Sequence, residues 1–437
     1  MDARVVAFTL LLSLATGVAF GLAPAFQASR VDLVAAVKQG GRTAGSGARW
    51  LRGGLVVAEI AVSLLLLIGA GLMIRSFIEL QRVDPGFRSD HVVTMSLFLG
   101  PSRFERSGAL LDQVLARVRT LPQVRAAGAV HFLPLSGRES GTWVYPSELP
   151  APLAGSQPVA AVSVITPGYL RAMGIELLRG RDFEERDRNG SRRVLIANES
   201  AARQFYPGED PIGKHLKVAW GRSPEPVEVV GVVRDIRHDA MRDKPKPSVF
   251  LPYDQNPSMY SSLAIRSSGD PLRLTSAIKA EIQAVDKNLP VSEIRSMDSV
   301  LAESIARPRL ESTLLSVFAA LALILATVGI YGVISYSVSR RTQEIGIRMA
   351  LGARSGSIAK LVVMEGLLLA AIGLACGIAA ALALTRYLES FLFGVVATDK
   401  AVFGGLSALL MAVALAATLV PALRAARVDP MVALRHE

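Results

Sequence analysis

Long apolar runs with almost no charge constrain this chain of 437 residues more than any other feature of its sequence. A run of about 20 such residues is long enough to cross the hydrocarbon core of a bilayer as a helix. Between the second and third runs, residues 75–313 have the mixed composition of a soluble protein. We therefore expect a multi-span membrane part and one large soluble domain. The runs that qualify as spans are Val5–Ala23, Leu55–Ile74, Leu314–Val338, Leu361–Leu384 and Ala401–Val420.

The first and last runs are followed by similar segments. Residues 24–38 and 421–435 share Pro, Ala, Ala, Arg, Val, Asp and Ala in register. We interpret this repeat as a duplicated membrane unit, of which the chain holds the last helix of one copy and the whole of the next. A cleaved signal peptide is the alternative for the first run. Basic residues that follow it, such as Arg30 and Lys38, would resist translocation, so a membrane helix is favoured.

The positive charge is concentrated in three short segments. Residues 24–54 and 339–360 each carry five basic residues and one acidic residue, and residues 424–437 carry three basic and two acidic ones. They therefore hold +9 of the net charge of +11. All three lie on one side of a five-span topology, which by the positive-inside rule is the cytoplasm. The basic balance reflects orientation in the membrane and argues against a nucleic-acid partner.

This topology places residues 75–313 and the loop at 388–400 outside the cytoplasm. The single cysteine, Cys376, lies within an apolar run. The sequence therefore predicts no disulfide framework and no thiolate metal site.

Strand-helix-strand patterns at both ends of the soluble region predict an α+β domain with a ferredoxin-like porter subdomain. Pro134–Pro158, rich in Pro, Gly and Ser, is predicted to be a loop. The predicted strands are His91–Leu99, Val124–Leu133, Ser262–Arg266 and Pro290–Ile294, and the predicted helices are Arg106–Leu121 and Leu272–Val285.

The residues from about Val159 to Pro252 predict a small α/β subdomain inserted into the first one. A short helix at Pro167–Gly174 is expected to end at its glycine. The other predicted elements are strands at Val162–Thr166, Val194–Asn198, Val227–Val233 and Ser248–Leu251 and a helix at Glu199–Phe205.

No motif in the sequence predicts catalysis. Gly208–His215 nearly matches a phosphate-binding P-loop, but His215 replaces the magnesium-binding hydroxyl and the loop is acidic. The five histidines lack metal-ligand spacing, and the best cluster, around His238, is explained by a polar loop. We predict no catalytic residue, no metal and no cofactor, so the chain is not expected to be an enzyme.

Two carboxylates, Glu59 and Glu365, lie inside predicted spans. Such groups are costly unless they snorkel, pair or face the bundle interior. Each follows a basic cytoplasmic segment within its first turns, so we expect interfacial placement. Proton-coupled transport is the weaker alternative, because the spans contain no chain of ionisable groups.

The most informative cytoplasmic stretch is Ser339–Arg354. It predicts a short amphipathic helix that ends at Gly352. This helix is either a membrane-surface helix with snorkelling arginines or a knob that docks on a cytoplasmic partner. The expected apolar face consists of Ile345, Met349 and Leu351, and the expected exposed residues are Arg340, Arg341, Glu344 and Arg348.

This stretch resembles a known family. The run Arg341–Ala353 resembles the intracellular loop of the FtsX-like and MacB-like ABC permeases, and Val56–Ser76 resembles their first span. Thr166–Asp182 and Val229–Asp235 resemble the MacB-like periplasmic core. The duplicated exit motif resembles the orphan subgroup with two tandem permease units, seen widely in acidobacteria, of which this chain would be the C-terminal half.

The resemblance implies a four-helix membrane unit per copy, usually dimeric or paired with a second permease unit, in contact with membrane lipid. It also implies a cytoplasmic ABC ATPase subunit, separate or fused, that grips the loop. No substrate can be read from the sequence. The loop residues implied to couple to the ATPase are Arg341, Glu344, Ile345, Arg348, Met349, Leu351 and Gly352.

We predict an ABC-type permease subunit that couples cytoplasmic ATP hydrolysis to conformational change of a periplasmic domain. The alternative is an ATP-independent, membrane-anchored binding or assembly module. The predicted divisions are 1–54, a preceding helix and linker; 55–75, the first span of the unit; 76–308, the periplasmic core with its insert at about 159–252; and 309–437, the FtsX-like part with three spans.

Overall fold

The computed structural model describes residues 44–150, 152–153, 155–220 and 226–427, together with Phe8, Leu10, Leu11 and Leu14. The predicted span Val5–Ala23 and the exit segment at 24–38 therefore lie almost entirely outside the described residues. The chain divides into two compact units. One contains Leu315–Ser390 with the described residues up to Leu72 and from Val396 onward, and the other contains Met73–Leu314 and Phe391–Val395.

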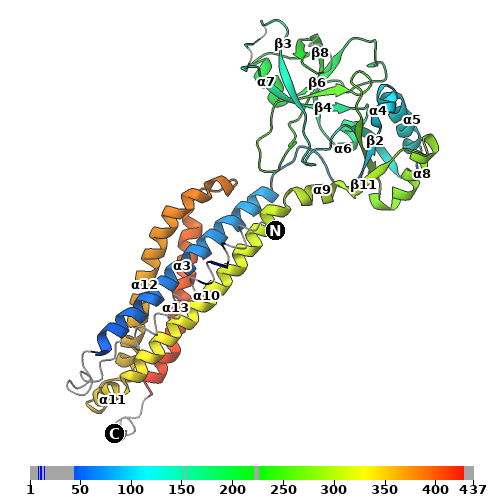
Figure 1. Cartoon of the computed structure of the whole chain (residues 1–437). Helices are drawn as coiled ribbons and strands as arrows, with labels where there is room; N and C mark the ends of the chain where they lie inside the picture. Colours follow the sequence, from blue (N-terminus) through cyan, green and yellow to red (C-terminus); the bar gives the residue numbers. More distant parts are fainter. Residues whose placement is uncertain are drawn as a thin grey trace. The chain divides into compact units, whose positions relative to one another are not determined.

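Long apolar helices build the first unit (Figure 1). Within the described part of the chain, four helices are long and apolar enough to cross a membrane. They coincide with the second to fifth predicted runs, as expected for apolar segments of this length. Their bounds are α3 Ala44–Gln81, α10 Ala306–Arg340, α12 Ser355–Leu388 and α13 Lys400–Ala425.

Small residues bring the helices of the first unit into close contact. A Cβ atom on Gly373 of α12 would lie 2.7 Å from the Cβ of Ile60 in α3, and one on Gly377 would lie 3.0 Å from the carbonyl oxygen of Ala61. On another side of α12, a Cβ on Gly366 would lie 2.2 Å from Thr418 of α13. Gly373 and Gly377, four residues apart on α12, therefore allow α3 to approach closely.

The second unit contains a four-stranded antiparallel sheet with the order β11-β1-β10-β2. Numbered along the chain, this is the 4-1-3-2 order of a ferredoxin-like fold, which confirms the predicted pair of strand-helix-strand units. The strands are β1 Val92–Phe98, β2 Val124–Val130, β10 Tyr260–Ser267 and β11 Val291–Ser296.

Helices cover both faces of this sheet because its apolar residues alternate between the two sides. Met95 and Leu97 of β1 share one core with Leu111 and Ile278, whereas Val92 belongs to another. The first core is closed by α5 Ser107–Arg119 and α8 Thr275–Val285, and the second by α6 Tyr169–Met173 and α9 Met297–Ser304. Short connecting helices are α4 Gly100–Arg103, η1 Phe104–Arg106 and η2 Pro271–Leu274.

The inserted subdomain is a closed ring of strands with the pairing β4-β3-β7-β8-β6-β9 and back to β4. The pairs β4–β9 and β6–β8 are parallel, and the others are antiparallel. Helix α7, Glu199–Phe205, is capped by the side chain of Asn198. The strands are β3 Gly141–Pro146, β4 Val159–Ile165, β6 Val194–Asn198, β7 His215–Val218, β8 Pro226–Val233 and β9 Ser248–Pro252, with β5 Leu177–Gly180 added beside β8.

The prediction of a loop throughout Pro134–Pro158 is wrong, because β3 lies within it. The strands β5 and β7 were also not predicted. These strands are short, and β3 exposes Trp143 on its outer face. These segments form strands because they pair with distant strands, for example β3 with β7, and not because of a local apolar pattern.

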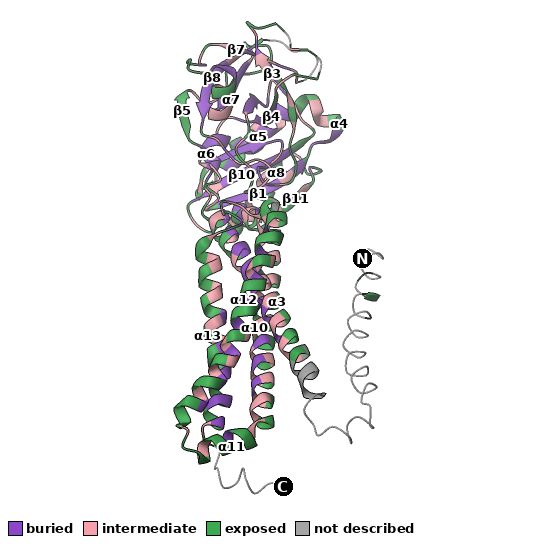
Figure 2. Ribbon diagram, turned by 90° about the vertical axis from the view of Figure 1, so that its left-hand side faces the viewer, coloured by how far each residue is buried: buried purple, intermediate pink, exposed green. Residues whose placement is uncertain are grey.

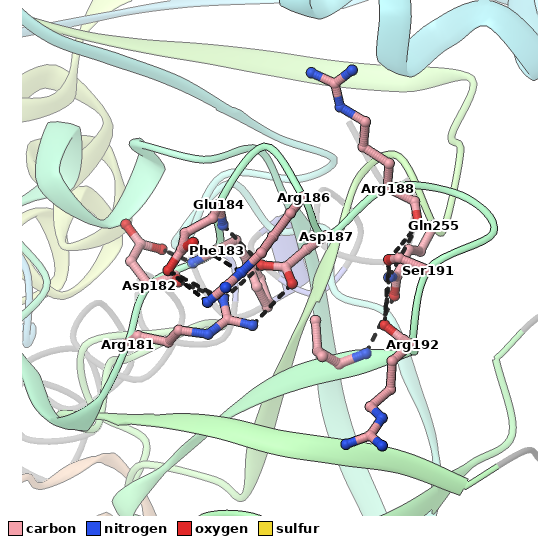
Figure 3. A network of polar contacts seen from close by, with 11 residues as sticks. Arg181, Asp182, Phe183, Glu184, Arg186, Asp187, Arg188, Ser191, Arg192 and Gln255 are labelled. Atoms are coloured by element: carbon pink, nitrogen blue, oxygen red, sulfur yellow. Dashed lines mark hydrogen bonds and ion pairs between the residues drawn. The ribbon is translucent and has the colours of Figure 1, made fainter.

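A polar network stiffens the loop before β6 (Figure 3). The guanidinium of Arg181 donates to both carboxylate oxygens of Asp187, at 2.7 and 2.9 Å, and the Glu184 amide donates to the same group at 2.8 Å. Burial alone would raise the pKa of Asp187, but these hydrogen bonds outweigh it and the pKa is lowered. Nearby, the side-chain amide of Gln255 donates to the carbonyl of Arg192 at 3.0 Å.

Candidate functional site

The predicted cytoplasmic helix is present as α11, Thr342–Ala350 (Figure 2). It starts directly after α10, where the Ile345 amide donates to the carbonyl of Arg341 at 2.8 Å. It ends in a Schellman motif, in which Gly352 has a φ of +94° and the Ala353 amide donates to the carbonyl of Arg348 at 3.0 Å. This closing turn requires a left-handed residue, which explains the glycine at position 352.

Helix α11 has an inner and an outer face. Ile345 and Gly346 are buried, and Met349 is half-buried. The outer face follows helical spacing i, i+3, i+4, i+7. Its members are Glu344, Ile347, Arg348 and Leu351, which together form what we call the outer face of α11.

The structure corrects two of the predicted positions. Leu351 was expected on the apolar inner face, but its side chain is 82% exposed. Arg341 was expected to be exposed, but it is half-buried and paired with Glu365. Ile347 was not predicted as a site residue, although it is 44% exposed. Its spacing of three residues from Glu344 and four from Leu351 was the signal that could have identified it.

Two ion pairs border a cavity of about 340 Å³ beside α11. Arg341 contacts Glu365 of α12 at 3.0 Å, and Arg348 contacts Glu344 at 2.6 Å within the helix. The lining contains equal numbers of cationic and anionic side chains, and most of its other residues are apolar, with Ile345 among them. A charge-balanced lining does not favour a charged small molecule.

The second intramembrane carboxylate, Glu59 of α3, lies against α10. A Cβ atom on Gly329 would come within 2.1 Å of the Glu59 Oε2 atom, so the glycine leaves the space that the carboxylate occupies. The structure therefore separates the two carboxylates by environment. Glu365 has a cationic partner, and Glu59 faces a helix backbone.

The remaining candidate motifs do not assemble a catalytic or metal site. No group of three or more possible metal ligands occurs among the described residues. The P-loop-like segment connects a helix to a strand, the reverse of the order in a P-loop, and its Gly213 amide donates to the carbonyl of Val229 at 2.8 Å. It forms a turn whose Lys214 contacts Glu209.

Two of the histidines are enclosed. The Nδ1 atom of His131 accepts a hydrogen bond from the Val164 amide at 3.0 Å. The Nε2 atoms of His131 and His238 are enclosed without a partner. Burial lowers the pKa of both histidines to about 4, so both are neutral at pH 7.

Two family descriptions match the chain. The MacB-like periplasmic core domain matches residues 53–287, more than half of the chain. The FtsX-like permease C-terminal description matches residues 316–430. The second match includes α11 and its cavity.

Curated relatives show similar coverage. The uncharacterized ABC transporter permease YknZ of Bacillus subtilis is 27% identical over 64% of this chain and 70% of its own length. The macrolide export ATP-binding/permease protein MacB of Hahella chejuensis is 26% identical over 88% of this chain and 57% of its own length, so this chain spans little more than half of that relative. The crystal structure of the periplasmic region of MacB from Actinobacillus actinomycetemcomitans has a TM-score of 0.33 at 15% identity, over 51% of this chain and 95% of that one.

Proposed function

Because this chain belongs to the family of FtsX-like permeases with a MacB-like periplasmic core domain, we propose that the outer face of α11 docks a cytoplasmic ABC ATPase subunit. The chain is an ABC transporter permease, a multi-pass protein of the bacterial inner membrane, and its family implies pairing with an ATPase subunit. In this proposal, the partner hydrolyses ATP, and the chain converts the partner's motion into a conformational change of its periplasmic domain.

One observation carries the docking proposal: apolar side chains on the outer face of α11 are exposed and not covered by other described residues. Leu351 is 82% exposed and Ile347 is 44% exposed. The Glu344–Arg348 pair lies beside them on the same face. An apolar centre with charged neighbours is the usual anatomy of a protein interface. A membrane-surface helix is less well supported, because Glu344 would face anionic headgroups.

The coupling route is supported by the way α11 is attached to its neighbours. Its start is continuous with α10, and Arg341 at that junction contacts Glu365 of α12 at 3.0 Å. Ile345 is buried beside the same ion pair, in the wall of the same cavity. A displacement of α11 would therefore act on α10 and α12 together. Helix α12 in turn contacts α3 closely at Gly373 and Gly377.

The experiment is to purify the full chain in detergent and measure its binding and stimulation of a candidate ABC ATPase subunit. The Ile347→Asp/Leu351→Asp variant should lose at least about tenfold in affinity, since buried apolar anchors dominate interfaces. The matched control is Leu153→Asp, because Leu153 is equally exposed, at 82%, but lies in the second unit. If the α11 variant and the control bind equally well, the docking proposal is wrong.

The same experiment separates the alternative function. A membrane-anchored module that works without ATP would neither bind nor stimulate the ATPase in its unaltered form. Stimulation by the unaltered chain, lost in the α11 variant, would support the coupling proposal against this alternative.

A further inference from the structure

A second cavity, of about 340 Å³, lies in the second unit, which by sequence contains the end of α3, the start of α10 and the loop 391–395. Its volume is in the range of small-molecule sites. Most of its wall is apolar and includes Phe77, Leu80, Phe391 and Phe393. It is separate from the cavity beside α11, with which it shares no lining residue.

Hydrogen bonds hold the wall of this cavity in place. The Ser76 hydroxyl, which is buried, accepts a hydrogen bond from the Phe393 amide at 2.8 Å. The guanidinium of Arg242 donates to the carbonyl of Phe391 at 3.1 Å. At Gly394 a φ of +67° favours glycine, and a Cβ there would be in ordinary van der Waals contact with Glu79 of α3, at 3.4 Å. The loop at 391–395 is therefore held in place as one wall of the cavity.

The polar part of the lining is cationic overall. It contains Arg242, Arg307 and Glu311, two positive charges against one negative charge. Arg307 contacts Glu311 at 3.1 Å. Guanidinium groups are the preferred protein partners of phosphate oxygens.

The position of the lining along the chain places it at the membrane surface. Met73 to Leu80 are among the last residues of the candidate span Arg52–Gln81, and Arg307 to Glu311 are among the first of the span Ala306–Arg340. The residues between these spans form the periplasmic domain. By sequence, the lining therefore lies next to the periplasmic ends of two candidate spans, the level at which lipid phosphates meet acyl chains.

We propose that this cavity binds an anionic phospholipid, with an acyl chain among Phe77, Leu80 and Phe391 and the phosphate at Arg242 and Arg307. The apolar wall matches the chain, and the cationic edge matches the phosphate. Neither feature alone would select a phospholipid. This site does not depend on the proposed ATPase docking, because its residues lie in the other unit.

The test measures the thermal unfolding of the delipidated full chain in detergent as phosphatidylglycerol is added. We expect a saturable rise in Tm, a smaller rise with phosphatidylethanolamine and none with glycerol phosphate, which has the anion without the chain. An equal rise with glycerol phosphate would show a site for free anions, and an equal rise with phosphatidylethanolamine would show no preference for anionic lipid. Either result overturns the proposal, as does the absence of any rise.

Variants locate the effect. Arg242→Gln should weaken the apparent affinity for phosphatidylglycerol about tenfold, as expected for a lost charge-assisted contact. Its control is Arg82→Gln, because Arg82 lies at the end of α3 but not in the cavity lining. Leu80→Trp should abolish the rise by filling the cavity, and Ala240→Leu is a milder filling variant if Leu80→Trp fails to fold. Equal losses in Arg82→Gln and Arg242→Gln, or an unchanged rise in both filling variants, would show binding elsewhere and refute the site.

Discussion

The cavity beside α11 and the cavity at the start of α10 have the same volume of about 340 Å³, but their linings differ in charge and in exposure. The first is bordered by two cation-carboxylate pairs that cancel, next to an exposed apolar helix face. The second has an apolar wall with an excess of one positive charge. Volume alone does not decide which ligand or partner a cavity favours. Charge balance and the exposure of neighbouring side chains do.

The largest expected effect is a difference in thiol labelling between α11 and the loop that contains Glu185, which we predict to face different compartments. In a Cys376→Ser background, Glu185→Cys should react fully with a membrane-impermeant thiol reagent in intact spheroplasts, and Leu351→Cys should not react. Both side chains are highly exposed, at 89% for Glu185 and 82% for Leu351. Asp187, although in the same loop as Glu185, is buried and would be a poor reporter. Labelling of Leu351→Cys would show that α11 faces the same compartment as Glu185, and the predicted topology would be wrong.

The next effect concerns the outer face of α11. Exchanging the charges of the Glu344–Arg348 pair keeps an i, i+4 ion pair but reverses its orientation toward any partner. We expect stimulation of the ATPase to fall by about 100-fold, the scale of a desolvated interfacial charge pair. The stability of the chain should change by about 0.5 kcal/mol or less. Unchanged stimulation would mean that this pair makes no contact with the ATPase.

A third effect, a loss of stability at low pH, should be confined to the second unit. No histidine occurs among the described residues of the first unit. Burial lowers the pKa of His131 and His238 to about 4, below about 6.5 in an unfolded chain. Between these values the unfolded chain binds protons that the folded domain does not, so stability falls as the pH falls. At pH 5 each histidine should cost about 2 kcal/mol relative to pH 7.

Urea unfolding of the excised domain 76–308 at pH 7 and pH 5 measures this loss. The His238→Leu variant should remove roughly half of it, since one of the two titrating groups is gone. A pH dependence identical to that of the unaltered domain would show that His238 does not carry the effect.

We also expect this fragment to show no ATP binding by calorimetry, for the reasons given for the turn at Gly208–His215.

The smallest effects compare two ion pairs of the same chemistry. Arg341 and Glu365 are 29% and 34% exposed, whereas Arg307 in its pair with Glu311 is 88% exposed. Glu365→Gln should destabilise the chain by about 1 to 3 kcal/mol, because it leaves a partly buried cation without its partner. Arg307→Gln should cost about 0.5 kcal/mol or less. Thermal unfolding in one detergent measures both, and equal losses would show that burial does not distinguish the pairs.

Much of the architecture could be predicted because local spacing encodes it. Apolar runs of the right length predicted the helices α3, α10, α12 and α13. Alternating and helical apolar patterns predicted the elements of the ferredoxin-like subdomain, and the glycine at 174 ends α6 with a φ of +64° as expected. The end of α11 also follows from a local signal, since Gly352 has no substitute of equal conformational freedom.

The errors have physical causes that differ from one another. Leu351 was misplaced although helical spacing groups it with Ile347 and Glu344, so that signal was present in the sequence. The strand β3 had no such signal, because its ordering depends on β4 and β7. No local signal marked the pairing of Arg341 either, because its partner Glu365 lies 24 residues away on α12.

By itself, the sequence determined the spans, their orientation, the class of the periplasmic domain and the position of the loop helix. Each of these depends on residues that are close together along the chain. The tertiary structure decided which face of α11 is exposed, which carboxylate is paired and where the second cavity forms. The hydrogen bond between Ser76 and Phe393, for example, joins residues 317 positions apart. Such contacts depend on how the whole chain closes on itself, and no local pattern specifies them.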